Sequence, residues 1–111
     1  MLRKSQRLNL KTSFKLVQSG RRTETPSLRL MWRSGESEMP LVGIALTKAS
    51  FRKAHERNRA KRLAATAIQQ LYPRLRKGLN LVIMPKAGIL AKSADQLISE
   101  LEDAKDLYQV N

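Results

Sequence analysis

The densest run of charge in this chain lies between residues 52 and 62, which read RKAHERNRAKR. Six of these eleven residues are Arg or Lys, and the single acid, Glu56, can relieve little of the repulsion within the run. Cationic side chains bind phosphate oxygens, and such contacts supply most non-specific affinity for nucleic acids. Charge runs are usually solvated helix faces, but here Asn58 adds an amide that could meet a base edge or a phosphate. The run therefore predicts a docking face for a nucleic acid.

Other residue types that could carry chemistry are sparse. His55 is the only histidine and there is no cysteine, so a metal site built on His55 is not expected, and a surface histidine is the simpler interpretation. No nucleophile elbow, P-loop or dinucleotide-binding glycine pattern occurs. The carboxylates near the C-terminus share one predicted helix and are interpreted as a solvated acidic face; they are Asp95, Glu100, Glu102, Asp103 and Asp106. We expect neither a catalytic residue nor a protein-bound metal in this chain.

Two aromatic side chains have alternative interpretations. Phe14 is most simply a core residue, although it could line a groove and stack on a base. Trp32 alternates with Leu28 and Leu30, so we place it in the core. Met31 falls on the opposite face of the same strand, between Arg29 and Arg33, where an adaptable apolar side chain would suit an extended nucleic-acid strand.

The totals indicate one folded, strongly basic domain. The chain has 111 residues, a formal charge of +13 and a hydrophobic fraction of 41%, which is enough for a modest core. Residues 93–111 reverse the sign, with five acids and one lysine. No apolar run approaches the roughly 18 residues that span a bilayer, and no signal peptide is recognisable. We expect a single domain over residues 1–111, with a flexible basic arm at 1–8, in the cytoplasm and without a membrane partner.

Periodicity predicts the order α-β-β-α-β-α. Asn9 is a plausible N-cap for a helix over 9–19, which Gly20 ends, and residues 21–26 are expected to form a loop. Strands are predicted over 28–33, 41–46 and 79–84, with the first two paired as a hairpin. A long helix over 53–71 carries one apolar stripe, and a last helix over 94–109 begins at a capping box, Ser93 and Gln96. This pattern favours an α+β or α/β sandwich in which helices pack on a small mixed sheet.

Several segments of the chain resemble a known protein family. Residues 57–63, RNRAKRL, are similar to the Arg-Asn-Arg motif of the bacterial ribonuclease P protein subunit. Arg7 and Leu8 followed by Phe14 and Gly20 resemble that family's first helix, and residues 42–48 resemble its second strand and the lysine-bearing segment after it. The element order matches as well. The resemblance implies a fold like the second domain of ribosomal protein S5, with a left-handed β-α-β crossover.

The resemblance also implies a division of labour within an endoribonuclease. A catalytic RNA would hold Mg²⁺ and remove the 5′ leader of precursor tRNA, while the protein binds both RNAs and needs no protein oligomer. The residues implied to face the catalytic RNA are Arg52, Lys53, Arg57, Asn58, Arg59, Lys61 and Arg62. Those implied to line or rim a leader-binding cleft between the first helix and the sheet are Phe14, Gln18, Arg29, Met31 and Lys48.

The chain departs from the family pattern at five positions, namely Gln18, Met31, Ala49, His55 and Ala65. Gln18 and Met31 stand where aromatic residues are frequent, which implies weaker stacking in the leader cleft. Ala65 stands in place of an arginine, which implies one phosphate contact fewer.

Two other classes of protein stay open from the residues alone. One is a ribosomal or RNA-chaperone protein with no role in cleavage, and the other is a DNA-binding protein that inserts the long helix into the major groove. A stand-alone metal nuclease is the least supported class.

Overall fold

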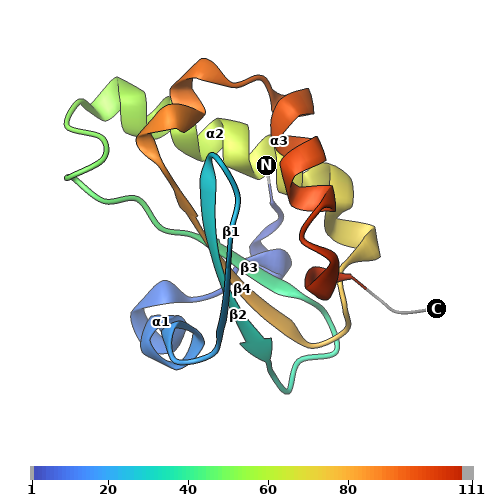
Figure 1. Cartoon of the computed structure of the whole chain (residues 1–111). Coiled ribbons are helices and arrows are strands. Elements are labelled where there is room, and N and C mark those ends of the chain that lie inside the picture. The colour runs from blue at the N-terminus through green and yellow to red at the C-terminus, as the bar shows by residue number, and fades with distance from the viewer. Residues whose placement is uncertain (1, 109–111) are drawn as a thin grey trace.

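The computed structural model describes residues 2–108 and contains a four-stranded mixed sheet between two layers of helix (Figure 1). The strands are β1 (Arg21–Glu24), β2 (Leu28–Ser34), β3 (Leu41–Ile44) and β4 (Leu79–Pro85), and the α-helices are α1 (Leu10–Gln18), α2 (Ala54–Leu71) and α3 (Ala94–Glu102). Short 3₁₀ turns complete the chain at Lys4–Gln6, Tyr72–Arg74, Ala87–Ala91 and Lys105–Leu107.

The strand order in the sheet is β1-β2-β4-β3. Strand β4 lies in the middle, antiparallel to β2 and parallel to β3, so α2 connects two adjacent parallel strands. The α-β-β-α-β-α order predicted from periodicity is confirmed apart from an added strand, β1. The left-handed sense of the β-α-β connection stays a prediction from the resemblance.

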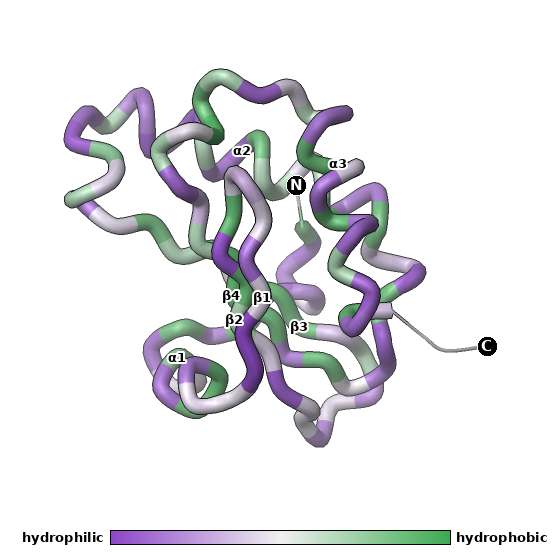
Figure 2. Tube along the Cα trace, in the orientation of Figure 1, coloured by the Kyte–Doolittle hydropathy of each residue, from purple (hydrophilic) through white to green (hydrophobic). Residues whose placement is uncertain are grey.

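The sheet separates the hydrophobic core into two clusters, one on each face. On one face, Leu28, Leu30 and Trp32 of β2 join the buried sides of α2 and α3, as the alternation along β2 predicts. On the other face, a smaller cluster of Leu8, Val17, Met31 and Val82 lies beneath α1. Figure 2 shows hydrophobic and hydrophilic residues alternating along these helices, as expected for elements with one buried side.

Two expectations about strands are wrong. Residues 21–24 form β1 rather than a loop, because backbone pairing with β2 holds four polar residues in an edge strand that has no apolar alternation to reveal it. The expected hairpin of β2 with β3 does not form, because β4, which comes later in the chain, lies between them. Sequential pairing is only a tendency, and a buried apolar strand such as β4 competes for the centre of the sheet.

The expectations about the two ends also need correction. Residues 2–8 are packed rather than a flexible arm: Leu2 is 6% exposed within the main core, and Leu8 N–H donates to the Val42 carbonyl at 2.9 Å. The last helix ends at Glu102 instead of near 109, and a 3₁₀ turn then carries Leu107 and Tyr108 back into the core. Residue 109 lies outside the described residues.

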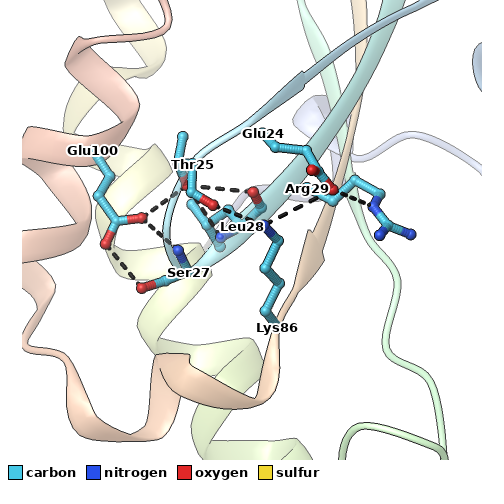
Figure 3. Close-up of polar contacts among 7 residues, drawn as sticks. All are labelled: Glu24, Thr25, Ser27, Leu28, Arg29, Lys86 and Glu100. Carbon is cyan, nitrogen blue, oxygen red and sulfur yellow. Dashed lines mark hydrogen bonds and ion pairs between the residues drawn. The ribbon is translucent and has the colours of Figure 1, made fainter.

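A polar clamp joins the turn between β1 and β2 to α3 (Figure 3). The Glu100 carboxylate accepts hydrogen bonds from the Thr25 hydroxyl, the Ser27 hydroxyl and the Ser27 N–H at 2.7–2.8 Å. Burial raises the pKa of Glu100, but these three donors outweigh it and hold the pKa below its usual 4.5. Lys86 donates to the Thr25 carbonyl at 2.9 Å from the other side, so the turn is fixed between β4 and α3.

Candidate nucleic-acid interface

Helix α2 exposes the charged run to solvent because its opposite side is buried in the core. Ala60, Ala64, Ala67, Ile68 and Leu71 are buried along one stripe of the helix. The prediction of a helix over 53–71 with this apolar side is confirmed. The same periodicity directs the intervening positions outward, so the charged residues form the outer side of a fixed rod.

The exposed side of the first turns of α2, together with the two residues that precede the helix, is hereafter called the cationic face. Its exposed members are Arg52, Lys53, Asn58, Arg59, Lys61 and Arg62. Within residues 2–108, no acidic side chain forms an ion pair with any of these cations. The positive end of a helix dipole disfavours cations, and here only Glu56 offsets them in the first turn. The face therefore gathers uncompensated positive charge that an external anion would neutralise.

Arg57 has a different environment from the rest of the motif. It is half-buried, and its Nη1 donates to the carbonyls of Phe51 at 2.9 Å and Arg52 at 3.1 Å. Phe51 itself is fully buried. Arg57 thus ties the segment before α2 to the helix and fixes where the cationic face begins, a role that the sequence motif did not reveal.

The residues expected at a leader-binding cleft are only partly brought together. Phe14 of α1 packs, half-buried, over the cluster that contains Met31, and Gln18 is exposed one turn later. Met31 does lie on the sheet face opposite Trp32, but it is 2% exposed beneath α1, so it has no surface to offer a nucleic acid in this structure. Lys48 is exposed in the connection between β3 and α2.

Arg29 is exposed, but its positive charge is paired with an acidic side chain. Its Nε donates to Glu24 at 2.8 Å, and Lys86 approaches the same carboxylate at 3.8 Å. The hydrogen bond from Arg29, and then the charge of Lys86, lower the pKa of Glu24. Arg22 lines a shallow hollow together with Arg29, and sequence reasoning missed it because β1 was expected to be a loop.

A second group of arginines lies over two aromatic rings, those of Trp32 and Tyr108. The guanidinium groups of Arg21 and Arg76 lie 5.6 Å and 5.8 Å from the Trp32 ring centre. Arg74 lies 5.0 Å from the Tyr108 ring centre and pairs with Glu102 at 3.1 Å. These groups have internal partners, in contrast to the cationic face, which makes the cationic face the better candidate for an external ligand.

Comparison with known proteins bears on the same residues. Residues 2–108 match the family model Ribonuclease P, which spans nearly the whole chain and includes the cationic face. The chain belongs to the ribonuclease P protein family. The motif resemblance at residues 57–63 and the fold expected from it are thereby confirmed at the level of the family.

Curated members of the ribonuclease P family resemble the chain over most of its length. The ribonuclease P protein component of Acinetobacter baylyi is 37% identical over 79 residues, covering 71% of this chain and 60% of that protein. The component from Yersinia enterocolitica is 31% identical over 87 residues, covering 78% of this chain and 72% of that protein. The match therefore spans less than two thirds of the Acinetobacter protein.

Solved ribonuclease P proteins share the fold. A Thermotoga maritima RNase P protein, determined in complex with 1-(4-fluorophenyl)-2-thiourea, superposes with a TM-score of 0.79 at 19% identity, covering 95% of this chain and 100% of that one. A Staphylococcus aureus RNase P protein gives a TM-score of 0.80 at 14% identity, covering 96% of this chain and 100% of that one. At these identities the likeness establishes the architecture.

Among residues 2–108, no three His, Asp or Glu side chains gather into a group that could hold a metal ion. None of the helices in that part of the chain combines the length and the apolar character needed to cross a bilayer.

Proposed function

We propose that this chain is the protein subunit of a ribonuclease P and binds a catalytic RNA through the cationic face of α2. The observation that supports this most is the set of exposed cations there, Arg59, Lys61 and Arg62 among them, without acidic partners in residues 2–108. Each phosphate neutralised at such a face releases counterions, which favours binding.

The 5′ leader of precursor tRNA would follow the other side of the sheet, along α1. Exposed Gln18, half-buried Phe14 and exposed Arg29 supply a polar group, an aromatic ring and a shared positive charge there, and Lys48 adds a cation in the connection to α2. Arg22 joins Arg29 in this role. Met31 would act only indirectly, by supporting α1 from beneath.

The protein's contribution would be electrostatic and positional. Two RNAs repel each other at close range, and a rigid cationic domain between them lowers that cost. We assign Mg²⁺ to the catalytic RNA, as the resemblance to the family implies, where it would supply the metal chemistry for cleaving the phosphodiester bond. Such a subunit would not require a protein oligomer, and it would act in the cytoplasm.

Reconstitution tests the proposal directly. A bacterial ribonuclease P RNA is mixed with precursor tRNA at a Mg²⁺ concentration too low for the RNA alone, and removal of the 5′ leader is scored with and without this protein. We expect the protein to restore cleavage at the mature 5′ end. Binding to RNA without any stimulation would instead favour an RNA-chaperone role and reject a role in cleavage.

A further inference from the structure

A half-open cavity of about 170 Å³ lies beside the cationic face, and its lining residues come from the N-terminal segment, β3 and α2. Its walls are mainly apolar and come from Leu2, Leu8, Leu10, Val42, Ile44 and Ala65. An apolar cavity of about 150 Å³ is large enough to hold benzene. A flat six-membered ring therefore fits this space.

The packing of the N-terminal segment creates the cavity and holds it open. Arg7 Nε donates to the Leu2 carbonyl at 3.1 Å, and Leu8 N–H donates to the Val42 carbonyl at 2.9 Å, so this segment forms one fixed wall. A Cβ on Gly43 would lie 2.6 Å from Leu10 Cδ2, so the glycine is what allows Leu10 to close that side. Ala65, with its short side chain, lines the cavity from α2.

The edge of β3 supplies polar groups to the cavity. Ala45 N–H donates to Ile83 at 2.9 Å and so faces β4. Neighbouring residues of a strand direct their backbone groups to opposite edges, so the N–H and C=O of Ile44 face away from β4. Along residues 2–108 the pairing at this outer edge consists of one isolated bridge, Arg7 with Val42, and no strand continues past Ile44. One donor and one acceptor therefore lie at the cavity wall.

Two cations stand at the lining of this cavity. Arg7 and Lys61 both line it and both are exposed, and neither pairs with an acidic side chain within residues 2–108. Lys61 also belongs to the cationic face, so the cavity continues directly from that face. Apolar walls, a backbone donor and acceptor, and flanking cations together match one nucleotide, whose base is flat and whose phosphate is anionic.

We propose that this cavity receives a single unpaired base of pyrimidine size from the RNA that docks on the cationic face. Ile44 backbone groups meet the edge of the base, and Arg7 and Lys61 hold the phosphates on either side. This inference rests on the proposed RNA docking. It adds a contact by which the protein would recognise an unstacked base as well as the charge of the phosphates.

Filling the cavity tests this contact. Ala65→Met places a long side chain into the space without changing charge, and Gln70→Met adds the same side chain at an exposed position of α2 outside the cavity lining. We expect Ala65→Met to weaken binding to a bacterial ribonuclease P RNA about tenfold, the order expected for loss of one bound base. Gln70→Met should stay within about twofold of the parent, with thermal unfolding confirming that both variants fold. Equal affinities of Ala65→Met and Gln70→Met would overturn the inference.

The variant Arg59→Ala separates this inference from the proposed function. If Arg59→Ala weakens binding while Ala65→Met does not, the cationic face binds RNA and the cavity is unused. If Arg59→Ala has no effect either, RNA docking on α2 itself fails.

A second measurement needs no variant at all. Methyl resonances of Leu8, Val42 and Ile44 are followed by nuclear magnetic resonance as cytidine 5′-monophosphate is added to the unsubstituted protein. We expect these methyl signals to shift, whereas those of Ile98, on α3, stay in place. Absence of a shift at millimolar nucleotide, or equal shifts at Ile98, would reject a base-binding cavity.

Discussion

Arg57 and Arg59 lie two positions apart on α2, yet their guanidinium groups have different surroundings. Arg57 is half-buried and donates to two carbonyls of the segment before the helix, whereas Arg59 is exposed and without an acidic partner among residues 2–108. From the sequence motif alone, both arginines are expected to have the same role. The structure separates a residue that positions the cationic face from residues that form it.

The exposed position of Arg59 makes a prediction about salt. Replacing Arg59 by Ala should weaken binding to the catalytic RNA and reduce the slope of log affinity against log salt by about 0.7–0.9, because one phosphate contact is lost. The measurement is binding across a salt series, with Lys105→Ala as the control, since Lys105 is an exposed cation far along the chain from α2. An unchanged slope for Arg59→Ala would remove this residue from the interface.

How far sequence predicts single residues depends on what surrounds them. The alternation of Trp32 with Leu28 and Leu30 correctly predicts that Trp32 lies in the core, because it indicates which side of β2 is buried. Met31 was expected on the opposite face and lies there, but alternation cannot reveal that α1 covers that face. The cavity beside Ala65 was likewise invisible, because it is formed by residues far apart in sequence.

Among the elements, α2 was predictable and the sheet was only partly so. Eighteen residues with a regular stripe specify a helix locally, and Asn9 and the Ser93–Gln96 capping box marked the starts of α1 and α3. Strand β1 has no apolar pattern, and the pairing of β3 with β4 depends on residues nearly forty positions apart. Local pattern determines such elements poorly, because tertiary pairing decides them.

The clamp between Glu100 and the β1–β2 turn makes a prediction at this scale. Glu100→Ala should lower the free energy of unfolding at pH 7 by about 2 kcal/mol, because the turn loses three hydrogen bonds to a charged acceptor that is partly exposed. Chemical denaturation measures this, with Glu36→Ala, at an exposed carboxylate in the β2–β3 connection, as the control.

The same clamp should respond to acid with a defined sign. The pKa of Glu100 is lower in the folded state than its usual 4.5, so its contribution is complete above pH 4.5 and is lost as pH falls through the lower folded value. The stability difference between the parent and Glu100→Ala should therefore shrink as pH drops below 4.5. A difference that stays constant down to strong acid would show that the carboxylate charge is not what fixes the turn.

For the whole molecule, a formal charge of +13 on 111 residues implies self-repulsion in the folded state. The three ion pairs found within residues 2–108 all lie away from the cationic face, which leaves that face unrelieved. The unfolded chain can spread the same charges farther apart. The free protein is therefore less stable than its packing alone would make it.

Salt that screens these charges should restore part of the stability that their repulsion removes. Raising sodium chloride from low to moderate concentration should increase the melting temperature, by roughly 4–8 °C for each kcal/mol of repulsion screened. Chloride is preferred to sulfate for this test, since sulfate also strengthens hydrophobic burial. A melting temperature that is flat or falls with salt would show that the charges are spaced too widely to repel.

The central position of β4 has a consequence for synthesis. During translation residues 52–62 are made before β4, yet β4 is the strand on which both β2 and β3 pair. A nascent chain that has not reached Pro85 exposes its arginine-rich segment with no completed sheet behind it. The polypeptide is thus most open to non-specific contacts with ribosomal RNA in the interval between the synthesis of its cationic helix and the synthesis of the strand that completes its sheet.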